Sequence, residues 1–341
     1  MREQVFERCR AAVPGWRDLD VDDFEFDQPK GFSSFTMGIR ARDGVSAEPR
    51  AVLYRHLAGK ENAILDGDTE REVFLMLGEH HVAARCLHYD DTCRIEEFFT
   101  GRTLTADDVF DPAIQRGIAN ELYRLHQLRP ANLPGRTFFE LLHDQWGAMA
   151  RTVLGERRAD FPADEQALCQ DLTEIYSDRT IAKVMRCLPD RPPVFCHNDT
   201  YHGNVMLLDD GSVKLVDFEF SCLNHIAFDF ANLFAETVMR HGFADPPHFR
   251  IAEPTFTDDN LASLIGYYLD NAEFTSSADR RAELDELVGE TRRAIMLSDY
   301  MYAMAALPLA LEPIQRIRFL PYSRQRFQRF LDAWHAEFGH D

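Results

Sequence analysis

The sequence lacks any apolar run long enough to cross a membrane. The longest, MYAMAALPLAL at 301–311, contains a proline and is far shorter than the roughly 20 residues that a spanning helix needs. The N-terminal stretch MREQVFERCRAAVPGW is charged throughout and has no apolar segment of the kind found in signal peptides. We therefore expect a cytoplasmic protein that has no membrane as a partner.

The sequence also has few lysines, and its cysteines are not closely paired. The seven cysteines are scattered and contain no Cys-x-x-Cys pair, which argues against a disulfide framework and a structural zinc site. There are 33 arginines but only 4 lysines, and the acidic residues bring the net charge to −20. We expect no nucleic-acid partner, because binding to a phosphate backbone normally needs a basic face. Such a composition is typical of salt-loaded cytoplasms, although a GC-rich genome would also favour arginine.

The order of apolar patterns predicts two regions of different character. A chain of 341 residues with 45% hydrophobic content is long enough for two lobes. The first hundred residues show short strand patterns and one helical pattern, with Asp68 or Thr69 as its candidate cap. Helical patterns dominate after that, apart from one hairpin. We therefore predict an α+β, two-lobed protein, with a first lobe at 1–99 and a second at 100–341. The strand patterns lie at 23–26, 32–41, 50–57, 84–89 and 94–99, and the helical patterns at 66–79, 112–128, 137–154, 164–188 and from about 224 onward.

The stretch VFCHNDTYHGN at 194–204 has the residue types that phosphoryl transfer from ATP requires. A carboxylate must take the proton of the acceptor hydroxyl, and oxygen ligands must hold Mg²⁺. Asp199 is the candidate base, and Asn204 offers an amide oxygen. The hairpin that follows, VMLLDDGSVKLVDF, returns the chain to Asp217, so Asn204 and Asp217 are predicted to lie at the same open end.

Other interpretations of this stretch remain open. Asp199 and Asn204 could be turn residues that bind their own backbone. His197 could be a base or a metal ligand, but we expect it to bind the backbone near Asp217 and to hold the loop. His202 is expected to be a solvated loop residue, because no second ligand stands at a spacing typical of zinc.

A cation is needed to steady the α- and β-phosphates of ATP. Arg55 lies within the strand pattern RAVLYRHL, whereas Lys60 follows Gly59 in a predicted loop. Arg55 is therefore the candidate. Its acidic partner would be Glu70 or Glu72 of the helix at 66–79, and the sequence leaves both open.

With these residues identified, the sequence resembles the choline/ethanolamine kinase family, within a wider group of kinase-like phosphotransferases that includes aminoglycoside kinases. The segments VFCHNDTYHGNVMLL and KLVDFEFSCLNHIAFDFANLFAE are similar to the family's catalytic and Mg²⁺ segments. The segments VLYRHLAG and ELYRLHQL also resemble family segments. The resemblance implies a protein-kinase-like fold and ATP and Mg²⁺ as cofactors. It also implies that Asp199 is the base and that Asn204 and Asp217 are the Mg²⁺ ligands.

The resemblance implies further nucleotide contacts in the first lobe. The segment CRIEEFFTG is similar to the one that joins the family's lobes, so the backbone around Glu96, Glu97 and Phe98 is implied to meet adenine. The segment PKGFSSFT stands where the family has a short phosphate loop. Three of its residues are implied to approach the nucleotide, namely Gly31, Ser33 and Ser34.

The resemblance also implies a small, cationic acceptor. Glu236 is the implied carboxylate of the acceptor pocket, where it would offset an ammonium group. Choline kinases carry two tryptophans on a C-terminal helix, and here Tyr302 and Ala305 stand in their places. The aromatic side chains that remain to face a cation are Phe220, Tyr300 and Tyr302. The thinner cage makes choline a less suitable acceptor than ethanolamine or another amino alcohol.

The sequence thus predicts a kinase of a small amino alcohol, and three rivals are considered. One is a kinase of an aminoglycoside, a sugar or a thiosugar. The second is a non-catalytic nucleotide-binding module, against which the presence of Asp199, Asn204 and Asp217 argues. The third is a metalloenzyme built on His197 and His202. The oligomeric state and any need for high salt are left open.

Overall fold

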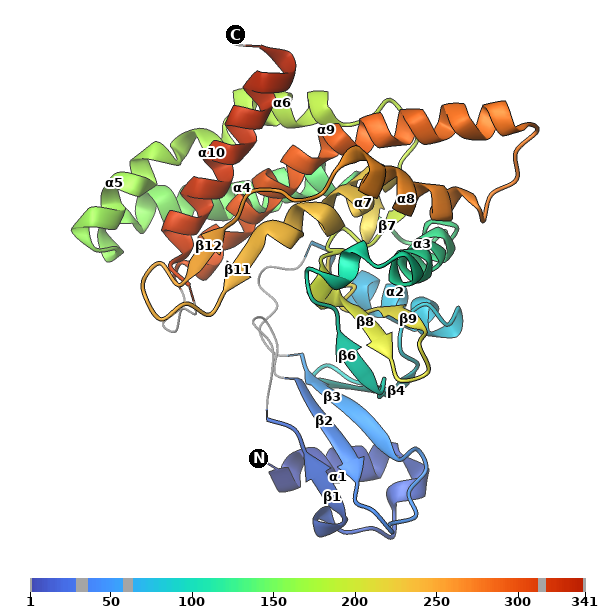
Figure 1. Ribbon diagram of the computed structural model, residues 1–341. Helices are drawn as coiled ribbons and strands as arrows, with labels where there is room; N and C mark the ends of the chain where they lie inside the picture. Colours follow the sequence, from blue (N-terminus) through green and yellow to red (C-terminus); the bar gives the residue numbers. More distant parts are fainter. Residues whose placement is uncertain (1, 29–35, 58–63, 312–316, 340–341) are drawn as a thin grey trace. The chain divides into compact units, whose positions relative to one another are not determined.

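The computed structural model describes residues 2–28, 36–57, 64–311 and 317–339 (Figure 1). The predicted nucleotide-loop residues Gly31, Ser33 and Ser34, and also Lys60, lie outside these residues. The chain divides into two compact units. The first holds residues 1–102 and 208–210, and the second holds residues 103–207 and 211–341.

The first unit is built on an antiparallel sheet of five strands in the order β1-β2-β3-β5-β4. Strand β3 pairs with β2 on one side and β5 on the other, so that Thr36 on β2 and Arg94 on β5 both lie opposite Arg55. The elements of this unit are α1 (Arg2–Ala12), β1 (Phe24–Phe26), β2 (Thr36–Ala41), β3 (Ala51–His56), α2 (Gly67–Glu79), β4 (Cys86–Tyr89) and β5 (Cys93–Glu97), and β6 (Gly101–Thr103) follows at the division.

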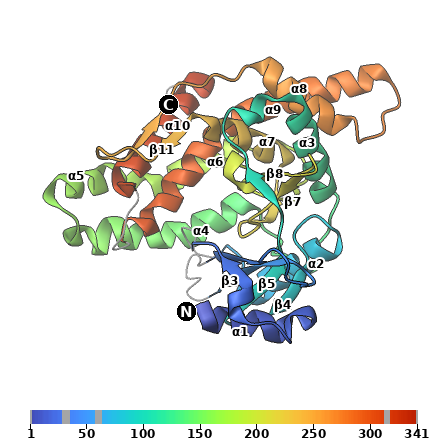
Figure 2. The ribbon, with the colours of Figure 1, turned by 60° about the horizontal axis from the view of Figure 1, so that its bottom comes forward.

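The two faces of this sheet have different coverings (Figure 2). Helix α1 packs its buried Phe6 into a core cluster that includes Phe24 and Ile95. Side chains alternate between the faces of a strand, so Arg94, next to Ile95, points to the other face. There its guanidinium lies 3.6 Å from the ring centroid of Phe74 on α2. The α2 face of the sheet therefore carries charged groups where the α1 face is apolar.

Two details of the first unit differ from the prediction. The charged N-terminal stretch forms helix α1, which the sequence analysis did not predict. The cap of α2 is Asp66, whose side chain accepts a hydrogen bond from the Thr69 backbone N–H at 3.0 Å, and not Asp68 or Thr69. The capping carboxylate lies immediately before the first turn, where the unpaired N–H groups of a helix lie.

The second unit consists mainly of helices that pack around α9. Helix α9 packs against α4, α7, α8 and α10 (Figure 1). The helices are α3 (Pro112–His126), α4 (Phe138–Arg151), α5 (Ala163–Asp171), α6 (Asp178–Cys187), α7 (Ile226–Ala235), α8 (Asp258–Leu269), α9 (Ser277–Leu309) and α10 (Phe319–Phe338). The strands are β7 (Val194–Cys196), β8 (Val205–Leu208), β9 (Val213–Leu215), β10 (Cys222–Asn224), β11 (Met239–His241) and β12 (Phe249–Ile251).

Two predictions for the second unit are wrong. The single helix expected over 164–188 is divided, because Ser177 is extended and caps α6 by accepting from the Thr180 N–H at 3.1 Å. The region after Asn224 was expected to be helical throughout, but the strands β11 and β12 form a hairpin there. The apolar run at 301–311 forms the end of α9, and within the described ranges no helix is both long and apolar enough to span a membrane.

Candidate active site

Two strand pairs place the predicted catalytic residues together in the second unit. Strands β7 and β10 pair antiparallel, and the chain between them contains the hairpin of β8 and β9. Val205 lies opposite Leu215, and the Val216 N–H donates to the Asn204 carbonyl at 2.9 Å. The pairing thus brings Asn204 and Asp217 to the same open end of the hairpin, and Asp199 lies on the loop that leads to Asn204.

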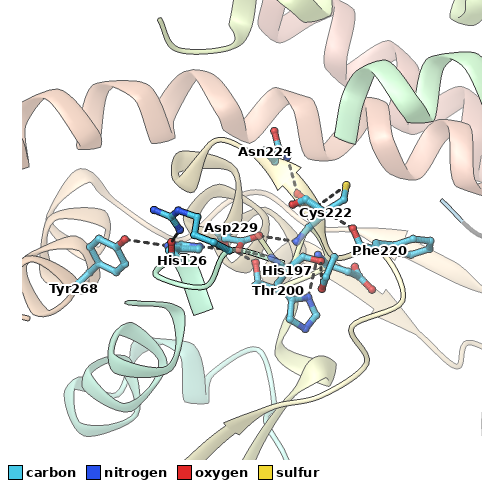
Figure 3. A network of polar contacts seen from close by, with 12 residues as sticks. His126, His197, Thr200, Phe220, Cys222, Asn224, Asp229 and Tyr268 are labelled. Atoms are coloured by element: carbon cyan, nitrogen blue, oxygen red, sulfur yellow. Dashed lines mark hydrogen bonds and ion pairs between the residues drawn. The ribbon is translucent and has the colours of Figure 1, made fainter. Parts of the chain in front are cut away.

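The loop before Asp199 is held by the carboxylate of Asp229 on α7 (Figure 3). The backbone N–H groups of His197 and Asn198 each donate to this carboxylate at 2.8 Å. Asp229 is fully buried, and Asn232 is the other polar residue of helix α7. Because the carboxylate binds two consecutive N–H groups, it fixes the direction in which the chain enters the catalytic loop.

A histidine and a tyrosine complete the environment of Asp229. The Nε2 of His126 lies 3.1 Å from the Asp229 carboxylate, and its Nδ1 lies 3.0 Å from the Tyr268 hydroxyl. Since a carboxylate only accepts, Nε2 carries the proton and the Tyr268 hydroxyl donates to Nδ1. His126 is also fully buried. Three helices, α3, α7 and α8, are joined in this way beneath the loop (Figure 3).

His197 binds the backbone on both sides of the hairpin. Its Nε2 lies 3.0 Å from the carbonyl of Val216, and its Nδ1 accepts from the Asp199 N–H at 3.2 Å. The imidazole therefore carries its proton on Nε2, and burial lowers the pKa of His197. It ties the residue before Asp217 to Asp199, which is the structural role that the sequence predicted.

The loop also contains backbone that only certain residues adopt. Asn198 and Asp217 have φ values of 67° and 66°, in the left-handed region where asparagine and aspartate are the most tolerated residues after glycine. Gly203 is required for a different reason. A Cβ there would lie 2.3 Å from the Tyr201 ring, so that ring can fold over the loop only because residue 203 lacks a side chain.

The Asp199 carboxylate is bound on both of its oxygens. The amide nitrogen of Asn204 donates to Oδ2 at 2.8 Å and also to the Asp199 carbonyl at 3.0 Å. The hydroxyl of Tyr302 on α9 donates to Oδ1 at 2.5 Å. The side chain is therefore fixed from two directions, while the second lone pair of Oδ1 is left to accept another proton.

The Asp199 carboxyl lies among other acidic groups. Loss of hydration raises the pKa of Asp199 to about 8, and the carboxylates of Asp217, Glu219 and Glu236 add to the rise. The hydrogen bond from Tyr302 opposes it. A perturbed carboxyl within a group of acids is typical of sites that take up a cation or transfer a proton.

The donor set at the hairpin end suits Mg²⁺. Both hydrogens of the Asn204 amide point to Asp199, so its Oδ1 is left facing away from that residue. Asp217 adds a partly exposed carboxylate. Amide and carboxylate oxygens are the ligands that Mg²⁺ prefers, and the residues present therefore fit the ion.

Glu236 lies at the end of α7 and is buried against an arginine. Its Oε1 accepts from the Arg326 guanidinium at 2.5 Å, and the Ser298 hydroxyl lies 3.5 Å from the same oxygen. Arg326, on α10, is itself fully buried and forms an ion pair with Asp299 at 3.0 Å. Burial raises the pKa of Glu236, although the Arg326 charge lowers it.

The predicted aromatic residues take different positions. Tyr302 contacts Asp199, as described above. Tyr300 is fully buried, its ring lies tilted against that of Phe330 with centroids 5.5 Å apart, and its hydroxyl lies 3.5 Å from Nδ1 of His143. The ring of Phe220 lies 5.5 Å from that of Trp146. The structure thus brings Tyr302, and not Tyr300, to the carboxylate of Asp199.

The predicted nucleotide residues of the first unit form a charged cluster. Arg55 lies 3.8 Å from Glu96, which is also 3.4 Å from Arg94. Of the two acids left open by the sequence, Glu70 is buried and Glu72 is exposed. Burial therefore favours Glu70 as a partner for an ion pair on this face of the sheet.

The other two residues of the implied adenine segment lie beside Glu96. Glu97 is exposed, and its backbone N–H donates to the Arg85 carbonyl at 2.9 Å. The Phe98 ring lies 4.3 Å from the Arg40 guanidinium. The nucleotide roles of Arg55, Glu72 and Glu96–Phe98 remain predictions.

Three residues that shape the site were not predicted from the sequence. Asp229 was quoted only as part of the segment KLVDFEFSCLNHIAFDFANLFAE. An acidic residue within an apolar helical pattern could have identified it. No sequence pattern identifies His126 or Arg326, because their partners, Asp229 and Glu236, lie 103 and 90 residues away along the chain. Such pairings depend on tertiary packing and leave no local pattern.

The comparison with protein families decides the relationship. The family model described as choline/ethanolamine kinase matches residues 31–331, which is most of the chain. The chain belongs to the choline/ethanolamine kinase family. The resemblance inferred from the catalytic segments is confirmed.

Individual members of this and a neighbouring family are similar over most of their length. A choline/ethanolamine kinase from Homo sapiens is 26% identical over 95% of this chain and 84% of its own. The choline kinase of Cryptosporidium parvum superposes with a TM-score of 0.76 at 18% identity, over 98% of this chain and 95% of that one. An aminoglycoside phosphotransferase superposes with a TM-score of 0.60 at 12% identity, over 98% of this chain and 99% of that one. The predicted protein-kinase-like fold is confirmed.

Proposed function

We propose that the protein is an ATP- and Mg²⁺-dependent kinase that phosphorylates the hydroxyl group of a small amino alcohol of the choline or ethanolamine type. One observation carries the proposal in a chain of this family. The Asp199 carboxylate is held by Asn204 and Tyr302, at the end of the hairpin where Asn204 and Asp217 meet. A carboxylate that could act as the base therefore lies beside two oxygen donors of the kind that Mg²⁺ prefers, which supports the proposal.

Asp199 acts as the base in this proposal. Its Oδ1 accepts the proton of the acceptor hydroxyl while the bond to Asn204 keeps the carboxylate oriented. Phosphoryl transfer depends mainly on positioning and electrostatics. A rigid carboxylate at the acceptor oxygen supplies the positioning.

Asn204 and Asp217 would hold Mg²⁺, which supplies positive charge against the phosphates of the nucleotide. Two ligands from the ends of one hairpin keep a fixed relation to each other, because the strand pairing sets it. We assign catalysis and acceptor binding to residues 100–341.

We assign nucleotide binding to residues 1–99. Arg55 would steady the phosphates, and its ion pair with Glu96 holds the guanidinium on the sheet. The backbone around Glu96–Phe98 would meet adenine. The remaining predicted contacts are Gly31, Ser33 and Ser34, and the predicted acidic partner of Arg55 is Glu70 or Glu72.

A substrate panel tests the proposal. Release of ADP is measured at low and high KCl with choline, ethanolamine, other amino alcohols, aminoglycosides and small sugars. We expect turnover with an amino alcohol, and the Asp199→Asn variant should bind ATP but lose turnover by about 10²–10⁴-fold. Turnover only with an aminoglycoside or a sugar would assign the rival acceptor. A folded, ATP-binding Asp199→Asn variant with undiminished turnover would exclude Asp199 as the base.

A further inference from the structure

A histidine, an aspartate and a cysteine meet at the turn between β4 and β5 of the first unit. They are His88, Asp90 and Cys93, and their ligand atoms all lie within 4.8 Å of one another. Imidazole nitrogen, carboxylate oxygen and thiolate sulfur are the donors that Zn²⁺ takes from proteins. None of the three residues has a part in the proposed kinase reaction.

An irregularity in the pairing of β4 with β5 places His88 on the side of Cys93. Cys86 lies opposite Glu96. Two residues later, His88 lies opposite Ile95, because one extra residue of β4 interrupts the register. Such a bulge turns the side chains that follow it to the other face of a sheet. Ile95 and Cys93 are two residues apart on β5 and share the face of the α1 core. Without the extra residue, His88 would face α2.

The turn fixes one oxygen of Asp90 and leaves the other facing the cluster. Oδ1 accepts from the backbone N–H groups of Thr92 and Cys93 at 2.7 and 2.8 Å, and from the Thr92 hydroxyl at 2.7 Å. Oδ2 lies 3.0 Å from Nε2 of His88. The carboxylate is thus oriented by hydrogen bonds from its surroundings, as carboxylate ligands of metal ions commonly are.

A cation of the protein itself lies at this cluster. Nη1 of Arg8 on α1 lies 3.4 Å from Oδ2 of Asp90, 3.5 Å from Sγ of Cys93 and 2.6 Å from the Thr92 hydroxyl. The side chains of Arg8 and Asp90 are 46% and 39% exposed, and an ion pair that is so exposed contributes little stability. The position therefore attracts positive charge, and a divalent ion can displace the guanidinium.

The cluster is accessible from one side. The side chain of His88 is 40% exposed, whereas Cys93 is buried. An ion bound here has three protein ligands on its inner side and solvent on its outer side, which differs from the closed, cysteine-rich sites of structural zinc. Among the described residues, one other group of ligating side chains is as close, namely His126, Cys196 and Asp229. That group is fully buried, and its carboxylate already binds the catalytic loop.

We propose that the protein binds a Zn²⁺ ion through Nε2 of His88, Oδ2 of Asp90 and Sγ of Cys93, with water as the fourth ligand. The Cys93 thiol releases its proton to solvent as the sulfur–metal bond forms. One neutral and two anionic ligands balance the charge of the ion, so the Arg8 guanidinium is repelled and leaves the cluster. Zinc binding here shares no residue with the proposed Mg²⁺ site and does not depend on kinase activity.

Titration of the reduced, metal-free full chain with Zn²⁺ tests the site. A chromophoric chelator competes for Zn²⁺, and excess Mg²⁺ is present to occupy the oxygen ligands of the second unit. We expect His88→Gln and Cys93→Ser to weaken the affinity by more than about 100-fold, because loss of an outer-shell partner alone costs about 10- to 100-fold. Arg8→Gln removes the competing charge and should bind Zn²⁺ about 10-fold more tightly.

Cys86→Ser is the matched control, because Cys86 is a partly buried cysteine of the same strand as His88 and lies on the other face of the sheet. It should keep the parent affinity for Zn²⁺. Titration with Co²⁺ in place of Zn²⁺ then reports the sulfur ligand through its thiolate-to-cobalt charge-transfer absorption. We expect this absorption in the parent protein and in Cys86→Ser, but not in Cys93→Ser.

Two results would overturn the site even if the buried Cys93→Ser variant failed to fold. One is an equal Zn²⁺ affinity of the parent protein and His88→Gln, in which a partly exposed side chain is replaced. The other is a cobalt spectrum of the parent protein that contains no thiolate absorption. An Arg8→Gln variant that bound Zn²⁺ no more tightly than the parent would contradict the displacement of Arg8.

Discussion

The carboxylate of Asp199, the proposed base, is held by contacts that come from different parts of the sequence. Asn204 is five residues away, whereas Tyr302 is 103 residues away on α9. A hydrogen bond on each oxygen removes the rotational freedom of the side chain. The proposed base is therefore positioned before any acceptor arrives, which would lower the entropic cost of reaching the reactive geometry.

The buried charge of Asp199 should destabilise the protein without ligands at high pH. The pKa of the carboxyl is about 8 in the folded chain against 3.8 in the reference state, so the folded state binds its proton more tightly. The stabilisation from that proton is complete below pH 3.8 and is lost as the pH rises through about 8. The advantage of an uncharged residue at this position therefore grows with pH.

The Asp199→Asn variant tests this effect by thermal unfolding without Mg²⁺ or nucleotide. We expect its midpoint to exceed that of the parent protein by several degrees at pH 9, and the difference to shrink at pH 5. Asp258→Asn serves as the control, because Asp258 is exposed and should show little effect at either pH. A difference for Asp199→Asn that is the same at both pH values would contradict the account.

Sequence reasoning could predict Asp199, Asn204 and Asp217 because their spacing is local. The hairpin between Asn204 and Asp217 is encoded by two short apolar strands and an Asp-Asp-Gly-Ser turn, in which Gly211 has a φ of 85°. The contacts of Arg326 with Glu236 could not be predicted. Nothing in the segment SRQRFQRF distinguishes that arginine from Arg324, which pairs with Asp171, or from Arg329, which pairs with Asp299.

At the scale of elements, α7 supports the catalytic loop through one charged residue. Asp229 accepts from two loop N–H groups and from His126. It is surrounded by apolar residues of its own helix, so no water can replace a lost partner cheaply. The loop therefore depends on α7 for its direction, although it contributes its own reactive groups.

Replacing Asp229 by asparagine should disrupt this support. The amide presents one oxygen and one NH₂ group to donors that need two acceptor oxygens, so at least one buried N–H loses its partner. We expect the free energy of unfolding to fall by roughly 3 kcal/mol, measured by urea denaturation. The exposed Asp258→Asn should cost less than about 1 kcal/mol. An equal loss of unfolding free energy in the two variants would show that the Asp229 contacts add no more stability than those of an exposed aspartate.

The elements that sequence reasoning got wrong have local causes that periodicity does not report. The expected helix over 164–188 keeps its apolar spacing on both sides of Ser177, yet the cap at that residue starts a new helix. Strands β11 and β12 are three residues each, too short for an alternating pattern to be recognised. Longer elements such as α3 and α4 were predictable because their patterns extend over several turns.

At the scale of the whole molecule, charge is the dominant feature. The chain has 57 acidic and 37 basic residues, and its net charge is −20. Self-repulsion of this size opposes compactness and is weakened by salt. Many of the arginines form exposed ion pairs, such as Arg292 with Asp258, and these contribute little on their own.

Salt should therefore stabilise the folded protein. We expect the midpoint of thermal unfolding to rise by several degrees between 0.1 M and 1 M KCl, as the Debye length falls from about 10 Å to about 3 Å. NaCl at the same ionic strength should give nearly the same rise if screening is the cause. A midpoint that falls with salt would show that the attractive ion pairs outweigh the repulsion.

The central claim is that this protein transfers a phosphoryl group to an amino alcohol with Asp199 as the base. Phosphorus NMR of the protein with ATP, Mg²⁺ and ethanolamine tests it most directly, since it identifies the product and not only the loss of ATP. The account predicts a phosphate monoester signal that grows together with ADP, and that is almost absent for Asp199→Asn. Formation of ADP and inorganic phosphate alone, or equal ester formation by both proteins, would contradict it.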